Sequence, residues 1–440
     1  MRLPPNHPQR YALSNEIHAR PPPEVSTPER ISYIVINYGP DAAGSAIGDL
    51  GRLCVIWGVQ APTAEVTHFT AEQSGTRLKW ERHTEFVSYT FSRVGEFDHP
   101  FDKPVIQLIN EEWLATLAGT LVVGIHLAVQ QNNRFVPDLK DVRPDFSDNY
   151  LVGAKVAGGN GIVLTDFMIH ADEFSRMLVM DMKLGKRQAG RTVQRLLEIE
   201  TYRMMALLGL PVARRTGAML SGAEHELAEI TARMASDAAM PETQGAIDDE
   251  AALLLRLTRL AASVESEVAA NSFRFGASRA YYDLAKRRIS ELREERLTGV
   301  QTLEEFLDRR LAPAMATCSS VEKRLLDLSE RVARASDLLR TRVDIAREQQ
   351  NQTLLASMNR RARLQLRLQQ TVEGLSIAAI TYYVVGLVGY GAKAAKESGI
   401  PLSVEIVTGA SIPVVALVMW LLVRRLRRHA GVSEENIGNL

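Results

Sequence analysis

Two long stretches without a charged residue lie near the C-terminal end and restrict the fold of this chain most. They run from Gly374 to Tyr390 and from Ile406 to Val423. Each is about 17 or 18 residues long, near the lower end of the ~17–25 residues that cross a bilayer as a helix. Together they predict a transmembrane hairpin, and a pair of buried core helices is the alternative. The predicted segments are transmembrane helices at 374–392 and 406–423, an outer loop at 393–405 and a basic tail at 424–440.

Arginines on the outer sides of these stretches predict the orientation of the hairpin. One cluster precedes the first stretch and another follows the second, while the connecting loop has only Lys393 and Lys396 as basic residues. Because cytoplasmic segments carry an excess of Lys and Arg, both chain ends are expected in the cytoplasm and the loop outside. The same clusters would attract anionic lipid, and a gate or an anion site is the other interpretation. Their members are Arg360, Arg361, Arg363 and Arg367 before the hairpin, and Arg424, Arg425, Arg427 and Arg428 after it.

The composition excludes some classes of protein. The 440 residues include 52 Lys and Arg and 52 Asp and Glu, so a globally basic nucleic-acid-binding protein is not expected. Cys54 and Cys318 are the only cysteines, which fits a reducing compartment and gives no disulfide framework. The N-terminus has no apolar segment of the secretory type, so membrane targeting is expected from within the chain.

The N-terminal part of the sequence predicts an arm followed by a mixed domain. Residues 1–30 are rich in proline and predict an extended arm. His18 and Arg20 belong to this arm, which is expected to lie on its own domain, with docking to a partner as the alternative. Residues 31–171 contain strand-like apolar stretches, and the sequence around Gly75 alternates apolar and polar residues as a β-hairpin does. We therefore expect an N-terminal α/β domain and an α+β fold for the whole chain.

Helices are expected to dominate the chain from residue 172 onward. Residues 172–313 predict a helical domain, because apolar residues recur there at a spacing of three and four. Its first helix is expected to run from Asp172 to Gly209, and others to follow near 220–237, 248–272 and 277–297.

One further helix is predicted to be unusually long. Thr302 and Glu305 form the pattern of a capping box, which predicts its start. Residues 314–373 then contain neither Gly nor Pro and run without a break into the first apolar stretch. At 1.5 Å per residue this segment alone would be ~90 Å long, so we expect a stalk that packs against other helices or against other copies. Its heptad spacing is carried by Leu325, Leu328, Val332, Ala335 and Leu339.

Few residues form a pattern associated with catalysis or metal binding. The sequence contains no P-loop lysine motif, nucleophile elbow, HExxH or CxxC, so we expect neither an enzyme nor a cofactor. Gly158–Gly161 is expected to be a plain β-turn instead of a phosphate loop, since no helix follows it directly. Asp166 and His170, with Asp172 and Glu173 close by, are candidate metal ligands. The alternative is a strand end followed by a helix N-terminus that the acids stabilise.

The N-terminal sequence LPPNHPQRYALSNEIHARPPPEV resembles the opening of a bacterial family of predicted membrane-anchored proteins, the domain-of-unknown-function family 3422. The likeness extends over the whole chain and brings no established activity with it. Together with the predicted hairpin, it implies a multi-pass protein of the bacterial inner membrane.

The expected architecture is also similar to that of the CorA-type metal ion transporters. In that family a cytoplasmic domain precedes a very long helix that enters the membrane, five chains assemble, and a Gly-Met-Asn motif, commonly preceded by Tyr, lies at the pore mouth. Tyr390 and Gly391 stand at the corresponding place here, but Ala392 and Lys393 replace Met and Asn. A ring of lysines would repel a divalent cation. The resemblance therefore implies the topology and self-association, with a pentamer as the family's example, and it speaks against Mg²⁺ transport.

Three functions remain open from the sequence. The first is a homo-oligomeric ion channel or transporter, with Ser376, Thr381 and Gly386 as pore-lining candidates; packing between helices is the other role for such residues. The second is a membrane-anchored scaffold or binding protein whose cytoplasmic domain engages an unknown partner, and the absence of membrane-embedded charge favours it. The third, an enzyme on a membrane anchor, has no catalytic constellation behind it. The lipid bilayer is a partner in every case, and nucleic acid is in none.

Overall fold

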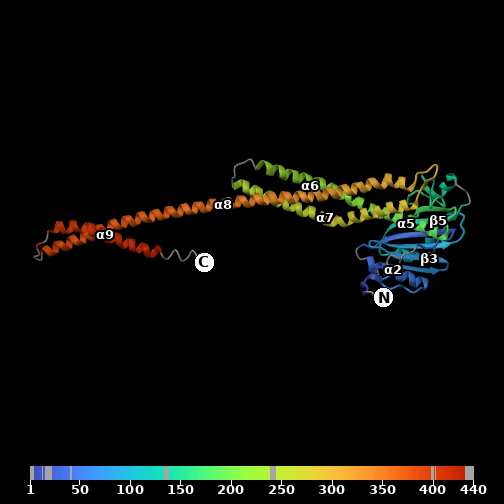
Figure 1. Cartoon of the computed structure of the whole chain (residues 1–440), viewed down its shortest axis with the longest axis horizontal. Helices are drawn as coiled ribbons and strands as arrows, with labels where there is room; N and C mark the ends of the chain where they lie inside the picture. The colour runs from blue at the N-terminus through green and yellow to red at the C-terminus, as the bar shows by residue number, and fades with distance from the viewer. Residues whose placement is uncertain are drawn as a thin grey trace. The chain divides into compact units, whose positions relative to one another are not determined.

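The computed structural model describes residues 4–11, 13–14, 22–39, 42–132, 138–237, 244–397, 401 and 403–431. The chain divides into two compact units, one made of residues 1–240 with 252–337 and the other of residues 241–251 with 338–440. The first unit contains a mixed sheet followed by helices, and the second contains the C-terminal helices (Figure 1). The predicted α+β class is therefore confirmed.

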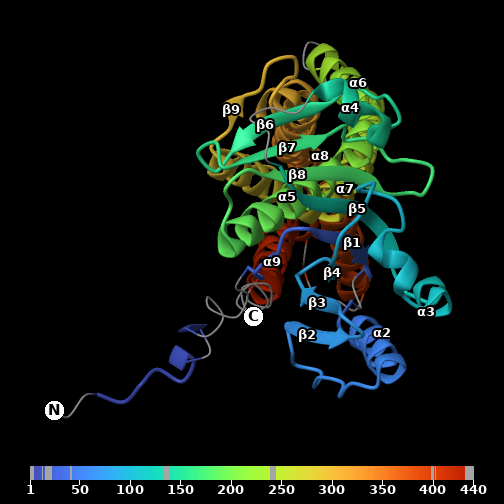
Figure 2. The ribbon, with the colours of Figure 1, turned by 90° about the vertical axis from the view of Figure 1, so that its right-hand side faces the viewer.

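One sheet of nine strands lies at the centre of the first unit within the described residues. The strands are β1 (Glu29–Asn37), β2 (His68–Gln73), β3 (Thr76–Arg82), β4 (Val87–Val94), β5 (Thr120–Gln131), β6 (Val152–Val156), β7 (Gly161–Thr165), β8 (Ser175–Asp181) and β9 (Glu295–Arg296). Their order across the sheet is β2-β3-β4-β1-β5-β8-β7-β6-β9 (Figure 2). The β2–β3 hairpin turns at Gly75, where φ is +77°, so the predicted hairpin is confirmed.

The two faces of the sheet are covered by different helices because strand side chains alternate between the faces. On β1, Ile34 and Ile36 belong to an apolar cluster with residues of α2 (Ala42–Trp57). Their neighbours Ile31 and Tyr33 point to the opposite face, where they line a cavity together with residues of α5 (Lys186–Leu207). The sheet is thus a layer between α2 and α5.

Aromatic side chains fill the face that α2 covers. Trp80, Tyr89 and Phe91 are buried there beside Trp113 of α3 (Glu111–Ala115), and the Trp113 Nε1–H donates a 2.8 Å hydrogen bond to the Asp49 carbonyl oxygen. Burial of one such side chain stabilises the fold by roughly 1.5–3 kcal/mol. A second cluster covers the β6–β8 end of the sheet with the help of two short helices, α4 (Leu139–Val142) and η2 (Arg143–Phe146). The short helix η1 (Val105–Leu108) packs into the first cluster.

The segment after residue 171 begins with a strand, so the helix expected from Asp172 to Gly209 is wrong in its first part. Ser175–Asp181 forms β8, which is buried at six of its seven positions and pairs with β5 on one side and β7 on the other. A central strand buried on both faces has a continuous apolar sequence, and periodicity alone does not separate it from a buried helix. Helix α5 begins only at Lys186.

Three long helices complete the chain up to the hairpin: α6 (Gly209–Asp237), α7 (Gln244–Leu292) and α8 (Leu303–Glu397). Helix α6 starts earlier than expected, and α7 joins the two helices predicted at 248–272 and 277–297. Gly276, between those two predicted helices, has open space around its Cα, and a single glycine costs a helix only about 1 kcal/mol. The predicted capping box is confirmed: the Glu305 N–H donates to Thr302 Oγ1 at 3.1 Å, and the Thr302 N–H donates to Glu305 Oε2 at 3.3 Å.

Helices α6 and α7 and the first part of α8 lie side by side in the first unit (Figure 1). Ion pairs join them, including Glu224 of α6 with Arg324 of α8 at 2.8 Å and Glu229 of α6 with Arg256 of α7 at 3.3 Å. The five predicted heptad positions from Leu325 to Leu339 are all buried. The long helix therefore has the apolar seam that its sequence predicts.

The C-terminal hairpin of the second unit consists of the end of α8 and of α9 (Val404–Gly431), which folds back along it (Figure 1). A Cβ on Gly389 would lie 3.2 Å from Thr408 Oγ1, so the two helices approach closely at this glycine. Helix α8 continues through Gly391 to Glu397. The helical conformation therefore extends past the predicted membrane segment 374–392 into the predicted outer loop 393–405, since the Lys- and Ala-rich sequence after Gly391 favours helix. The boundaries of the membrane segment stay a prediction.

Both helices of the hairpin are long and apolar enough to cross a membrane, by length and composition. The most apolar window of each helix is exposed within the described residues, whereas the core helices of a soluble protein are mostly buried. The alternative of two buried core helices therefore does not describe this hairpin, and its surface favours association with a membrane.

Candidate functional site

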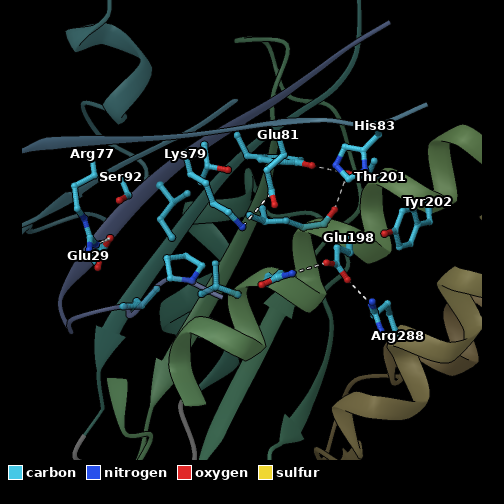
Figure 3. Close-up of a pocket in the computed structure, with 18 of the residues that line it drawn as sticks. Glu29, Arg77, Lys79, Glu81, His83, Ser92, Glu198, Thr201, Tyr202 and Arg288 are labelled. Atoms are coloured by element: carbon cyan, nitrogen blue, oxygen red, sulfur yellow. Dashed lines mark hydrogen bonds and ion pairs between the residues drawn. The ribbon is translucent and has the colours of Figure 1, made fainter. Parts of the chain in front are cut away.

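A cavity of about 320 Å³ lies in the first unit between the sheet and α5. Strands β1, β3 and β4 supply one wall, α5 supplies the other, and Arg288 reaches in from α7 (Figure 3). The wall from β3 follows from its sequence, because Arg77, Lys79 and Glu81 alternate with the buried Leu78 and Trp80. On α5, apolar and polar residues of one helix face complete the lining: Val193, Gln194, Leu197, Glu198, Thr201 and Tyr202.

Three ion pairs distribute charge along this cavity. Figure 3 shows Glu29 with Arg77 at one end, Glu198 with Arg288 at the other, and Lys79 with Glu81 between them. The Lys79 Nζ atom lies 3.0 Å from Glu81 Oε2, and both side chains are mostly buried. The lining therefore holds three cations and three carboxylates, each within reach of a partner of opposite sign, as buried charge requires.

Hydrogen bonds hold the α5 side of the cavity in place. Glu198 accepts a 2.7 Å hydrogen bond from the Gln194 side chain and also pairs with Arg288. Burial lowers the pKa of Arg288, but Glu198 and Glu291 outweigh this and raise it, so the guanidinium stays charged. Tyr33 shares a 3.1 Å hydrogen bond with Thr201, and burial raises the Tyr33 pKa, which keeps this hydroxyl neutral at the cavity wall.

The end of the N-terminal arm closes one side of the cavity. Pro23 and Val25 line it, and the Val25 N–H donates a 3.2 Å hydrogen bond to the Lys186 carbonyl oxygen at the start of α5. A Cβ on Gly190 would lie 1.8 Å from the Pro23 carbonyl oxygen, so only glycine lets the arm approach this helix. This part of the arm lies on its own domain, as predicted, whereas His18 and Arg20 fall outside the described residues.

The candidate metal ligands Asp166 and His170 do lie together. Their side chains form a 2.9 Å hydrogen bond, and Asn149 donates to the same carboxylate oxygen of Asp166 at 2.8 Å. Asp172 lies elsewhere, 3.8 Å from His126. Within the described ranges no group of three or more His, Cys, Asp or Glu residues could hold a metal ion, and a metal role for the Asp166–His170 pair stays a prediction.

A row of Ser32, His126 and Asp172, of which the first two are buried and Asp172 is exposed, was not anticipated from the sequence. Ser32 Oγ lies 3.1 Å from His126 Nδ1, and His126 Nε2 lies 3.8 Å from Asp172 Oδ2. Ser32 is 0% exposed and His126 is 2% exposed, and the Ile106 N–H already donates to the hydroxyl oxygen of Ser32. The order of the three residues matches a catalytic triad, but Ser32 is fully buried and its hydroxyl is already engaged by His126 and Ile106, so these hydrogen bonds have a structural role.

The pore-mouth candidates lie on different sides of α8. Tyr390 is 77% exposed, whereas Ala392 is 7% exposed; Gly391 and Lys393 are exposed. The helix is continuous through all four residues.

The pore-lining candidates do not share one face of α8 either. Thr381 is partly buried and its hydroxyl donates to the Ile377 carbonyl oxygen at 2.8 Å, while Ser376 and Gly386 are exposed. Neighbouring members of this set are five residues apart, which separates them by about 140° around the helix. A pore lined by all three would therefore need a different helix geometry.

The predicted basic belt lies on exposed helix surface where its side chains are described. The Arg424 guanidinium lies 4.9 Å from the centre of the Trp420 ring on α9, a cation–π arrangement suited to a membrane interface. The side chains of Arg427 and Arg428 lie outside the described part of the chain. The remaining belt residues are exposed, namely Arg360, Arg361, Arg363 and Arg367 on α8 and Arg425 on α9.

Comparison with known proteins identifies the family of the chain. Neither a curated protein nor a solved structure matches it significantly. One family model matches residues 5–430, which is nearly the whole length and includes the sheet, the cavity and the hairpin. The chain belongs to the family described as "Protein of unknown function (DUF3422)".

Proposed function

We propose that this protein is a membrane-anchored binding protein whose N-terminal domain holds a small polar molecule in the cavity between the sheet and α5. The observation that carries the proposal is the cavity itself. Its volume, about 320 Å³, lies within the range of ~300–1,000 Å³ that is usual for small-molecule sites. Its walls combine apolar side chains with a few charged groups, as such sites do.

The balance of charge in the cavity indicates the kind of ligand. Three carboxylates face three cations, so a ligand of one sign would leave one buried group without a partner, which is costly. A ligand that carries both an ammonium and a carboxylate group can pair with one member of an ion pair each. We therefore propose a zwitterion such as a free amino acid or a dipeptide.

Isothermal titration calorimetry of these zwitterions with the full-length protein in detergent tests the proposal. Arg288→Gln removes one charge of the Glu198–Arg288 pair and is expected to weaken binding by about tenfold or more. Arg287→Gln is the matched control, because Arg287 is the exposed neighbour on α7 outside the cavity. Saturable binding that is equal in both variants would place the ligand elsewhere.

The anchor in this proposal is the C-terminal hairpin, spanning the bacterial inner membrane twice with both chain ends in the cytoplasm. The arginine clusters at its outer ends support this orientation. Single cysteines introduced as Lys396→Cys and Arg425→Cys test it, since native Cys54 and Cys318 are buried. A membrane-impermeant maleimide is expected to label Lys396→Cys in spheroplasts and to leave Arg425→Cys unlabelled; the reverse pattern would contradict the orientation.

A second candidate is a homo-oligomeric ion channel of CorA-like build. One observation favours it: α8 is a single helix of 95 residues that runs from the sheet-containing domain into an apolar segment, so a change in the domain would be transmitted along a rigid element. The proposal predicts an oligomer, such as a pentamer, in detergent and ion flux in liposomes that changes in Lys393→Asn and in Gly391→Ala. A monomeric mass with no flux for any metal ion or anion would eliminate it.

A further inference from the structure

A second recess in the first unit lies apart from the proposed zwitterion cavity. It is a groove of about 1,090 Å³ formed where the end of α5 meets the start of α8. The loops before β6 and after β7 complete its walls. No residue lines both the groove and the cavity described above, so each can be altered independently.

Basic side chains outnumber acidic ones in the lining of this groove. Four arginines and two carboxylates line it. Arg296 pairs with Glu305, and Asp166 is held by His170. Arg203 pairs with Glu200, which raises the Arg203 pKa against the effect of burial.

Two arginines remain without a partner for their charge. Arg309 and Arg310 are consecutive residues of α8, are exposed, and line the groove. Within the described residues, no ion pair or hydrogen bond involves either guanidinium group. Two adjacent guanidinium groups match the charge and the fork geometry of a phosphate group.

Aromatic side chains supply the second element of recognition. Tyr150 lines the groove and is 88% exposed, and the Arg143 guanidinium lies 5.9 Å from the centre of its ring. Phe167 and Phe306 stack on each other in the lining, with ring centres 4.8 Å apart. The groove therefore offers the planar ring of a ligand the exposed aromatic side chain of Tyr150, beside an apolar wall formed by Phe167 and Phe306.

We propose that this groove binds a nucleotide, with the phosphate groups on Arg309 and Arg310 and the base against Tyr150. The volume is large enough for a ligand of that size. The juxtaposition of unpaired guanidinium groups with an exposed aromatic ring distinguishes it from a site for phosphate alone. The proposal does not depend on the zwitterion cavity.

Equilibrium dialysis of ADP against the full-length protein in detergent tests the proposal, with adenosine and inorganic phosphate as partial ligands. The wild type is expected to bind ADP at least about tenfold more tightly than either partial ligand. Arg309→Gln with Arg310→Gln is expected to weaken ADP binding by about tenfold or more, and Tyr150→Ala by about fivefold or more. Arg331→Gln, an exposed arginine of α8 outside the groove, and Arg288→Gln in the other cavity are expected to bind ADP as the wild type does.

Three outcomes would overturn the proposal: no saturable ADP binding by the wild type, ADP binding that the double arginine variant leaves unchanged, or inorganic phosphate bound as tightly as ADP. A thermal melt of each variant accompanies the binding assay. If the double variant does not fold, the single variants Arg309→Gln and Arg310→Gln carry the test, and each is expected to weaken ADP binding.

Discussion

Burial of His126 makes the stability of the first unit depend on pH in a defined direction. Loss of hydration in the interior lowers its pKa from 6.5 to about 4, although Asp172 acts in the opposite direction. Above pH 6.5 the imidazole is neutral in both the folded and the unfolded chain, so it contributes no pH dependence there. Below pH 6.5 the His126 imidazole is protonated in the unfolded chain but stays neutral in the folded chain until the pH approaches 4. The free energy of unfolding therefore falls as the pH is lowered.

The size of this effect follows from the difference between the two pKa values. One pKa unit corresponds to about 1.4 kcal/mol, so the full loss reaches about 3 kcal/mol once the pH falls below 4. Between about pH 7.5 and pH 5 the expected loss is about 2 kcal/mol. The variant His126→Asn keeps a polar partner for Ser32 but has no imidazole to titrate. From pH 7.5 to pH 5 its free energy of unfolding should therefore fall by about 2 kcal/mol less than that of the wild type.

Urea unfolding followed by tryptophan fluorescence measures the effect. Three of the four tryptophans, Trp57, Trp80 and Trp113, are buried in the first unit, while Trp420 lies on α9. The change in signal therefore reports mainly the unfolding of the first unit. His225→Asn, at an exposed histidine of α6, serves as the control and should retain the wild-type pH dependence. If wild type and His126→Asn lost equal stability between pH 7.5 and pH 5, the reasoning about His126 would be refuted.

Three further predictions concern backbone contacts. Gly190→Ala should displace the N-terminal arm and open the cavity, because its Cβ would overlap the arm backbone; faster proteolysis of the arm and weaker zwitterion binding are the readouts, and an unchanged digestion pattern would contradict this. Thr302→Ala should lower the free energy of unfolding by about 1 kcal/mol in urea, since it removes the cap of α8; no loss would show that the cap is dispensable. Gly389→Val should lower the melting temperature of the hairpin by circular dichroism because Thr408 leaves little room, whereas Gly386→Val, with open space around it, should not; equal effects would argue against this helix contact.

The sequence predicts the parts of this fold that local pattern determines. Three local patterns each indicate one structure, and the structure agrees with them. They are the alternation around Gly75, the capping box at Thr302 and the heptad positions of α8. The apolar run of β8 has two readings, because a strand buried on both faces loses its alternation. Helix α2 was not predicted, since Gly44, Gly48 and Gly51 lower its intrinsic helix propensity and only packing on the sheet stabilises it.

The candidate site was less accessible to prediction because it joins distant parts of the chain. The alternation of Arg77, Lys79 and Glu81 indicates a charged sheet face, and this wall could have been found from the sequence. Its partners could not, since Glu198 and Arg288 are 90 residues apart and their register depends on how α5 and α7 pack. The pore candidates stay a prediction. They were chosen by their position along α8, and the helical period places them on different faces of that helix.

Calorimetric titration of zwitterions into the wild type, Arg288→Gln and Arg287→Gln proteins tests the central claim most directly. The proposal predicts saturable binding to the wild type and to Arg287→Gln, and binding to Arg288→Gln that is weaker by about tenfold or more. Absence of binding to the wild type by every amino acid and dipeptide tried, or equal binding to all three proteins, would contradict it.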